Sequence, residues 1–328
     1  MNITLIASDN GLGHIKRLVY LSNILINQHN VSLMAPKNLV KKFKLNRNIK
    51  LQNFEMRINV KKNSYNYEWI RKIKNDSLNK TDLFISDNLP EIFELKKNSY
   101  LYANFLWHKI LKIKKKIKIE KDNLIKRNNL PVLGCYLFMH PQVSDNFKIT
   151  KIGLFGTFKG RKKNKIQNIL ISLGTAKLGI LKVRKVKKEL EKIFQYFKKK
   201  VNFYIDPALG KITNKNKNIK IFKANYSSQM FKKIDLAIIK PGLGTVNSCL
   251  EYSIPIFTYM SDFNEEFTYN AYIIKKNNLG FKIDNLIKLP KMIKKIDKEF
   301  FEKHYLLCKK LKWNGEKEIK KIINLNYQ

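Results

Sequence analysis

Apolar residues along the chain fall into short runs that end at glycine, proline, asparagine or aspartate, and segments with helical spacing separate these runs. Short apolar runs bounded by turn residues predict buried strands of a parallel sheet. The predicted strands cover residues 3–7, 31–34, 83–86, 131–139, 151–155, 169–173, 202–205, 219–222, 236–239 and 255–259, and residues 100–107 predict a further strand with its turn. Strands that alternate with helices in this way indicate an α/β protein.

The segments between these strands carry apolar residues at the spacing of an amphipathic helix. In the first of them, Leu18, Leu21 and Leu25 share one face of a helix predicted over residues 15–27. With a strand on either side this helix predicts a βαβ unit, which is right-handed by rule. The other predicted helices cover residues 106–127, 183–200, 246–252 and 290–323, and one more ends near Gly280.

A glycine turn follows the strand predicted over residues 236–239. The sequence there reads Lys-Pro-Gly-Leu-Gly-Thr, and we expect Thr245 to cap the next helix at its N-terminus. A glycine turn that leads into a helix leaves backbone N–H groups free to hold an anion such as a diphosphate. The sequence therefore predicts an anion site around Gly242 and Gly244.

A second glycine turn follows the first predicted strand and ends in His14. It is not a dinucleotide-binding fingerprint, because the third glycine of that pattern would have to stand where Lys16 does. His14 follows the carboxyl end of a strand, where open α/β sheets place their ligands. An imidazole can take a proton from an attacking hydroxyl at neutral pH. The alternative is an ordinary hydrogen-bonding loop histidine.

Asp87 also lies at the carboxyl end of a predicted strand. It could orient the His14 imidazole, or it could be the Asx-turn residue that starts the next helix. The sequence alone leaves both interpretations open.

Together these segments resemble the GT-B glycosyltransferases, and most of all the branch with the peptidoglycan N-acetylglucosaminyltransferase, monogalactosyldiacylglycerol synthase and the KPGYGT-type transferases. In the second half of the chain the resemblance rests on Lys240, Pro241, Gly242, Gly244, Thr245, Val246, Pro255, Asp262, Phe263, Glu266, Asn270 and Ala271. In the first half it rests on the GxGHxxR pattern of Gly11, Gly13, His14 and Arg17 and on the NFLW segment at residues 104–107.

The resemblance implies two Rossmann-like domains whose parallel sheets face each other across a central cleft. The expected division is an acceptor-binding domain over residues 1–156, a linker over 157–166, and a donor-binding domain over 167–328 whose last helix crosses back to the first domain. The implied reaction moves a sugar from a nucleotide-sugar, expected to be UDP-linked, to a hydroxyl of a glycan or lipid-linked acceptor in cell-envelope synthesis.

The resemblance also implies site residues. His14 and Asp87 are the expected catalytic residues. The expected donor-binding residues are Gly13, Gly174, Thr175, Gly242, Gly244, Thr245, Ser248, Glu265 and Glu266. No metal-binding DxD motif stands where the chemistry would need one, so we expect metal-independent transfer without a cofactor, and inversion at the sugar.

Two positions depart from the related transferases. Ser248 stands where a glutamate grips the ribose hydroxyls, and Phe267 stands where a glutamine is common. The departures indicate an unusual donor, a substitute carboxylate from Glu251 or Glu265, or a non-catalytic member of the fold. A nucleotide-sugar 2-epimerase is the alternative enzyme.

The formal net charge of +41 is extreme for 328 residues. It fits a protein held at nucleic acid or an anionic membrane, or a coding bias, since the lysines are dispersed over every segment. No nucleic-acid-binding signature is present, so nucleic acid is not an expected partner. The lysine-rich segment 106–127 predicts either an interfacial helix on an anionic membrane or an amphipathic helix on the domain surface.

The three cysteines are scattered without metal-site spacing, and we expect a reducing compartment. We find no secretory signal or apolar span in the sequence. The expected location is cytoplasmic, with peripheral attachment to the cytosolic face of a membrane as an option.

Overall fold

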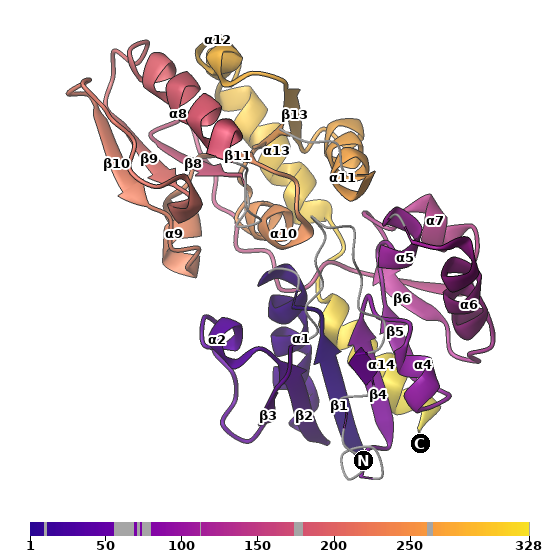
Figure 1. The fold of residues 1–328 in the computed structure, drawn as a ribbon. Coiled ribbons are helices and arrows are strands. Elements are labelled where there is room, and N and C mark those ends of the chain that lie inside the picture. The colour runs from indigo at the N-terminus through magenta and orange to yellow at the C-terminus, as the bar shows by residue number, and fades with distance from the viewer. Residues whose placement is uncertain are drawn as a thin grey trace. The chain divides into compact units, whose positions relative to one another are not determined.

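The computed structural model describes residues 1–328 except 10–11, 56–68, 71–72, 74–79, 112, 174–179, 261–264 and 328. The chain forms two compact units. The first unit comprises Met1–Gly156 together with Lys312–Gln328, and the second comprises Thr157–Leu311. Each unit is built on its own parallel sheet with helices packed against it (Figure 1).

The sheet of the first unit has seven strands in the order β3-β2-β1-β4-β5-β6-β7. All neighbouring strands are parallel. The strands are β1 (Asn2–Ala7), β2 (Asn30–Ala35), β3 (Lys50–Asn53), β4 (Leu83–Asp87), β5 (Tyr100–Tyr102), β6 (Val132–Cys135) and β7 (Ile149–Ile152). The strand order reverses between β1 and β4, and such a switch point is where open α/β sheets bind ligands.

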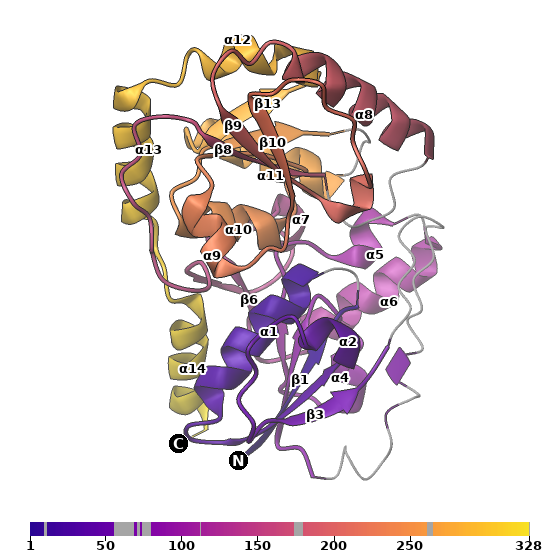
Figure 2. The ribbon, with the colours of Figure 1, turned by 90° about the vertical axis from the view of Figure 1, so that its left-hand side faces the viewer.

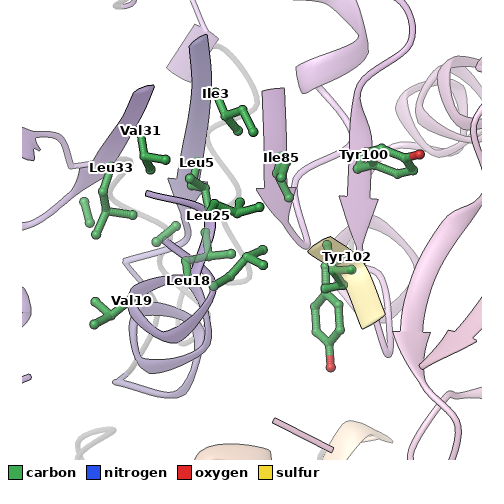
Figure 3. Packing of buried hydrophobic residues seen from close by; sticks show 14 of the residues in the cluster. Ile3, Leu5, Leu18, Val19, Leu25, Val31, Leu33, Ile85, Tyr100 and Tyr102 are labelled. Atoms are coloured by element: carbon green, nitrogen blue, oxygen red, sulfur yellow. The ribbon is translucent and has the colours of Figure 1, made fainter. Parts of the chain in front are cut away.

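Seven helices belong to the described part of the first unit. They are α1 (Leu12–Leu25), α2 (Lys37–Val40), α4 (Ile92–Leu95), α5 (Trp107–Ile110), α6 (Lys115–Lys126), α7 (Pro141–Ser144) and α14 (Gly315–Asn326). The apolar stripe of α1 faces the sheet, so Leu18 and Leu25 pack with Leu5 of β1 and Leu33 of β2 (Figure 3). Each fully buried leucine side chain contributes about 1.5–3 kcal/mol to stability.

The C-terminal helix α14 belongs to the first unit. It lies beside α1 (Figure 2), and its Ile319 and Ile323 are fully buried in the same core cluster. Leu154 and Trp313 form a parallel β-bridge just before this helix. The region predicted as one helical stretch over residues 290–323 is therefore three helices, of which only the last returns to the first unit.

The sheet of the second unit has six parallel strands in the order β10-β9-β8-β11-β12-β13. The strands are β8 (Asn168–Ser172), β9 (Val201–Ile205), β10 (Ile219–Lys223), β11 (Leu236–Ile239), β12 (Ile256–Tyr259) and β13 (Gly280–Ile283). The sequence did not predict β13, whose two middle residues are exposed at the edge of the sheet. Here the strand order reverses between β8 and β11.

The second unit buries large apolar side chains between its sheet and its helices. Phe194, Phe203 and Phe257 are among its largest fully buried residues. The helices are α8 (Ile180–Phe194), α9 (Ser228–Lys233), α10 (Leu243–Glu251), α11 (Glu265–Lys276), α12 (Leu289–Ile293) and α13 (Lys298–Lys310), with short 3-10 turns η2 (Pro207–Leu209) and η3 (Leu286–Lys288). The helix predicted over residues 183–200 ends earlier, at Phe194.

The single helix predicted over residues 106–127 is wrong. The chain forms α5 and α6 and leaves the helical conformation at Leu111, which is extended (φ −81°, ψ 152°) and buried. Trp107 of α5 and Ile125 of α6 pack into one apolar cluster, and Asp122 of α6 accepts a hydrogen bond from His108 of α5.

The segment expected to be a linker, residues 157–166, packs within the second unit. The Lys159 ammonium pairs with the Glu251 carboxylate at 2.5 Å, and the Lys159 backbone N–H donates to the Glu251 carbonyl oxygen at 2.7 Å. Lys163 is buried and donates to the Ile234 carbonyl oxygen at 2.5 Å. Burial lowers the pKa of Lys163 to about 8.

Candidate functional site

His14 and Asp87 meet at the switch point of the first sheet. Asp87 is the last residue of β4 and pairs in register with Ala7, the last residue of β1. His14 lies in the first turn of α1, which follows β1. Two neighbouring strands and the helix after the first of them therefore bring both side chains to the carboxyl edge of the sheet.

A short contact links His14 to Asp87, and Arg17 lies within hydrogen-bond distance of both residues. His14 Nδ1 lies 2.9 Å from Asp87 Oδ1. Arg17 Nε donates to Asp87 Oδ2 at 3.0 Å, and Arg17 Nη2 donates to Asp87 Oδ1 at 3.1 Å. His14 is 7% exposed and Asp87 is 1% exposed. The structure thus assembles a histidine, a carboxylate and a guanidinium in one buried group.

Asp87 is ionised in this group. Burial raises the pKa of the carboxyl, but the charge of Arg17 and the hydrogen bonds from His14 and Arg17 outweigh burial and hold the pKa below its ordinary value. An ionised carboxylate only accepts hydrogen bonds. Any neighbour of Asp87 within hydrogen-bond distance therefore has to be a donor.

That requirement assigns the tautomer of His14. Nδ1 lies 2.9 Å from Asp87 Oδ1 and 3.1 Å from Arg17 Nη2, but it carries one hydrogen at most. If Nδ1 carried a lone pair, that lone pair would face the carboxylate. With Nδ1 protonated, each donor has an acceptor, since Arg17 Nη2 is satisfied by Asp87 Oδ1. We therefore assign the Nδ1–H tautomer, which leaves the lone pair on Nε2.

Aromatic side chains enclose one side of the histidine. The ring centroids of His14 and Trp107 are 6.1 Å apart, and Trp107 packs edge-on against Phe105 at 4.8 Å. Asn88 has a positive φ of 68°, and with its amide oriented to suit both neighbours it donates to the Phe105 carbonyl oxygen and accepts from Trp107 Nε1 at 3.3 Å. Asn88, directly after Asp87, therefore holds Phe105 and Trp107 in place beside His14.

In the second unit, the glycine turn opens onto α10 as expected, but the predicted cap is wrong. The N-cap is Gly242 (φ −73°, ψ 132°), and no side chain caps the helix. Thr245 lies inside the helix, because the N–H groups of Thr245 and Val246 both donate to the Gly242 carbonyl oxygen. The amides of Leu243 and Gly244 precede these bonds and belong to the open end of the helix.

The helix α11 is fastened to the same turn. The Asn270 side-chain amide donates to the Pro241 carbonyl oxygen at 2.9 Å. The Phe267 ring, in the position where relatives carry glutamine, lies beneath the Lys240 ammonium, 4.2 Å from Nζ to the ring centroid. Glu265 and Glu266 form the first turn of α11, one turn before Asn270. A cation, two carboxylates and the open end of α10 thus lie at the carboxyl edge of the second sheet.

Two other residues weighed for the ribose site are engaged elsewhere. Ser248 Oγ donates to the Gly244 carbonyl oxygen at 3.1 Å, within α10. Glu251 is the last residue of α10, far from its open end, and pairs with Lys159. Of the carboxylates considered for that role, Glu265 is the one near the glycine turn.

The remaining predicted site residues fall into two groups. Gly13 lies beside His14 in the first turn of α1, which belongs to the first unit. Gly11, Gly174, Thr175, Asp262 and Phe263 lie outside the described residues. Among the residues that the structure does describe, no group of three or more His, Cys, Asp or Glu side chains is placed to hold a metal ion.

A polar cluster that was not predicted from the sequence lies at the carboxyl ends of β8, β9 and β10. The Tyr226 hydroxyl lies 3.0 Å from Ser172 Oγ, and Asp206 is buried beside them. Tyr226 has a positive φ of 57°, which is costly for an aromatic residue. The sequence pattern does not indicate this backbone conformation.

We compared the chain with protein families, with curated proteins and with solved structures, and the solved structures that match are glycosyltransferases. No protein-family model matches the sequence, and no curated protein matches it. Among solved structures, the glycosyltransferase SsfS6 of Streptomyces sp. SF2575 in complex with thymidine diphosphate matches with a TM-score of 0.66 and 14% identity over 99% of both chains. The spinosyn forosaminyltransferase SpnP matches with a TM-score of 0.69 and 10% identity over the whole of both chains.

A third similar structure is the spinosyn rhamnosyltransferase SpnG in complex with thymidine diphosphate. It matches with a TM-score of 0.64 and 10% identity, over 99% of this chain and all of that one. At these identities the likeness establishes the fold, and it covers both units. The chain therefore has the GT-B fold that the sequence predicted, with two parallel-sheet α/β units.

Proposed function

We propose that this protein is a glycosyltransferase that moves a sugar from a nucleotide-sugar donor to a hydroxyl group of an acceptor. The observation that carries the proposal is the His14–Asp87 contact of 2.9 Å at the switch point of the first sheet, in a chain with the GT-B fold. A neutral histidine with a free Nε2 lone pair is the group that hydroxyl deprotonation needs.

We place the donor diphosphate at the open end of α10. The helix dipole and the amides of Leu243 and Gly244 favour an anion there, and Lys240 adds a positive charge. Two similar structures were solved with thymidine diphosphate, which supports a nucleoside diphosphate as the ligand class. Gly242, Gly244 and Thr245 are proposed to contact it. UDP remains the nucleotide that the sequence resemblance favours.

The proposed step needs no metal ion. His14 Nε2 takes the proton of the acceptor hydroxyl, and Asp87 stabilises the imidazolium that forms. The acceptor oxygen then bonds to the anomeric carbon from the face opposite the diphosphate. The bond between that carbon and the diphosphate oxygen breaks, so the configuration inverts and the nucleoside diphosphate leaves. Helix amides and Lys240 stabilise the charge that develops on the leaving group.

We propose a glycan or lipid-linked acceptor, with contact to an anionic membrane through residues 106–127. Ile125 and Leu124 of α6 pack against the core of the first unit, whereas Ile119 of the same helix is half exposed. The exposed lysines Lys114, Lys115 and Lys116 are available, so this contact would be electrostatic. No helix among the described residues is long and apolar enough to cross a membrane.

A thermal-shift screen against UDP-, dTDP-, GDP- and CMP-sugars tests the proposal. A ligand at 100 times its Kd stabilises the native state by about 2.7 kcal/mol, and we expect one nucleotide class to do so. The stabilising donor is then incubated with candidate acceptors, and the released nucleoside diphosphate is measured. Isomerised donor without transfer would indicate the epimerase, and stabilisation by none of the donors would contradict the proposal.

A further inference from the structure

Arg17 holds the Asp87 carboxylate with two hydrogen bonds, from Nε to Oδ2 and from Nη2 to Oδ1. The guanidinium also lies over the Tyr102 ring, 5.2 Å from its centroid. A planar guanidinium that binds both oxygens of a carboxylate fixes its rotation as well as its charge. Asp87 can therefore present Oδ1 to His14 in one orientation only.

Helix α1 brings Arg17 and His14 to Asp87 together, because the two residues are three positions apart in this helix. Residues three apart lie on the same face of a helix, so both side chains reach the end of β4 from one turn. Arg17 is largely buried, with 13% of its side chain exposed. Water screens its charge much less than the charge of a surface arginine.

Arg17 affects His14 in two ways through this geometry. It compensates the buried charge of Asp87, which would otherwise draw a proton onto the pair. It also places Nη2 at 3.1 Å from His14 Nδ1, so that an imidazolium would stand next to a second cation. Both effects favour the neutral, Nδ1-protonated histidine over the imidazolium.

Two other titratable groups near the Asp87–Arg17 pair, both among the described residues, do not carry charge at neutral pH. Tyr102 of β5 lies within electrostatic range of Asp87 and Arg17, and Cys135 of β6 lies within electrostatic range of Arg17. Burial raises the pKa of Tyr102 and raises the pKa of Cys135 to about 11, so both stay neutral. Among the described neighbours of the pair, Arg17 supplies the positive charge.

We propose that Arg17 is a positioning residue that keeps His14 in its neutral, proton-accepting form by holding Asp87 and by opposing the imidazolium. The catalytic meaning of this assignment rests on the proposed function, but its electrostatic content does not. The resemblance of the sequence to other transferases places an arginine here without giving it this task.

An NMR titration of the full-length protein labelled with ¹⁵N-histidine tests the proposal without any substrate. The His14→Gln variant identifies the His14 signals, and the ¹⁵N shifts report the tautomer. In the unsubstituted protein we expect neutral His14 with Nδ1 protonated. In Arg17→Gln we expect the midpoint of the His14 titration to rise by about one pH unit or more. Arg17→Lys keeps the charge and should restore part of that difference.

Lys16→Gln is the matched control. It removes a neighbouring cation of the same helix that lies over the Tyr20 ring, 5.4 Å from its centroid, and we expect the midpoint to move by at most a few tenths of a pH unit. An unchanged or lower midpoint in a folded Arg17→Gln variant would overturn the proposal, as would an Nε2-protonated neutral His14. Failure of every nucleotide-sugar to bind would contradict the proposed function and leave this result untouched.

Discussion

His14 is the residue on which the proposed chemistry depends most. We expect His14→Ala to lower the rate of sugar transfer by about 10²–10⁴-fold, the usual contribution of a general base. Donor affinity should stay the same, because the diphosphate is proposed to bind to the second unit. The measurement is kcat by nucleoside diphosphate release together with donor Kd by calorimetry.

The pH profile separates two roles of this histidine. If His14 is the base, the rate of the unsubstituted enzyme falls on acidification as the imidazole is protonated, and this acidic limb disappears in His14→Ala. If His14 only anchors the acceptor, the variant raises KM and keeps kcat and the pH profile. The second result would leave Asp87 as the next candidate base.

His304 predicts a different pH effect, on stability. It is fully buried in α13, and burial lowers its pKa to about 4 from 6.5. Below pH 6.5 the His304 side chain therefore takes up a proton in the unfolded chain, whereas in the folded chain it takes up this proton only near pH 4. Stability from this residue is present above pH 6.5 and is lost as the pH falls, by about 3 kcal/mol in all.

The difference between the protein and His304→Leu isolates this contribution from the carboxylates that titrate in the same range. We expect the free energy of unfolding of the second unit to fall less steeply with acidification in the variant. Equal slopes between pH 6.5 and 4 would show that folding does not lower the pKa of His304, which would contradict the prediction. Absolute stability does not decide the matter, because the leucine also changes packing.

For single residues, the sequence indicated which side chains form the site but did not indicate which side chains contact one another. The pattern predicted that His14 and Asp87 each follow the carboxyl end of a strand, and the structure places Nδ1 and Oδ1 2.9 Å apart. The two hydrogen bonds of Arg17 depend on side-chain reach across 70 residues, which no spacing rule supplies. The positive φ of Asn88, which places Trp107 beside the histidine, was equally invisible.

Among the elements, α10 carries the proposed diphosphate contact through its open N-terminal turn. We expect Gly244→Val to weaken donor binding, since a branched side chain would stand where the diphosphate approaches the amides. The backbone should tolerate it, because Gly244 is not among the described glycines with positive φ, Gly156 and Gly210. Calorimetric donor Kd and a circular dichroism melt are the measurements.

A substitution one turn further along the same helix serves as the control. Asn247→Ala, in the second turn of α10, leaves the first-turn amides unobstructed and should bind the donor more tightly than Gly244→Val does. If Gly244→Val folds and binds as the unsubstituted protein does, the diphosphate does not lie at this helix end. The assignment of Gly242, Gly244 and Thr245 would then be withdrawn.

Elements buried on both faces were predictable, and those defined by tertiary contacts were not. The strand over residues 236–239 matches β11 because a buried parallel strand has to be a continuous apolar run. The break at Leu111 depends on two helices sharing one core, which leaves only a mixed apolar and basic pattern in the sequence. Thr245 is a good capping residue, but Gly242 takes that position because α10 starts earlier.

For the molecule as a whole, the charge of +41 has a testable local consequence. If the segment around Lys114, Lys115 and Lys116 touches an anionic membrane, replacing all three with glutamine should weaken vesicle binding by about 1 kcal/mol per lysine. Sedimentation with phosphatidylserine vesicles, at low and at high salt, measures it.

The same replacement at Lys198, Lys199 and Lys200, three consecutive exposed lysines of the second unit, is the matched control. Equal losses from both triplets would mean that total charge acts and no particular segment does. Absence of binding by the unsubstituted protein, or equal binding to neutral vesicles, would make the lysines irrelevant to membrane contact.

The most direct test of the account is hydrogen–deuterium exchange of the whole protein with and without a nucleotide-sugar that stabilises it. Because the diphosphate is proposed to bind the first amides of α10, peptides covering residues 240–251 and the start of α11 should exchange more slowly with the ligand. We expect no comparable change along β10, an edge strand outside the proposed contact. Saturable binding that leaves residues 240–251 unprotected, or no binding by any nucleotide-sugar, would contradict the account.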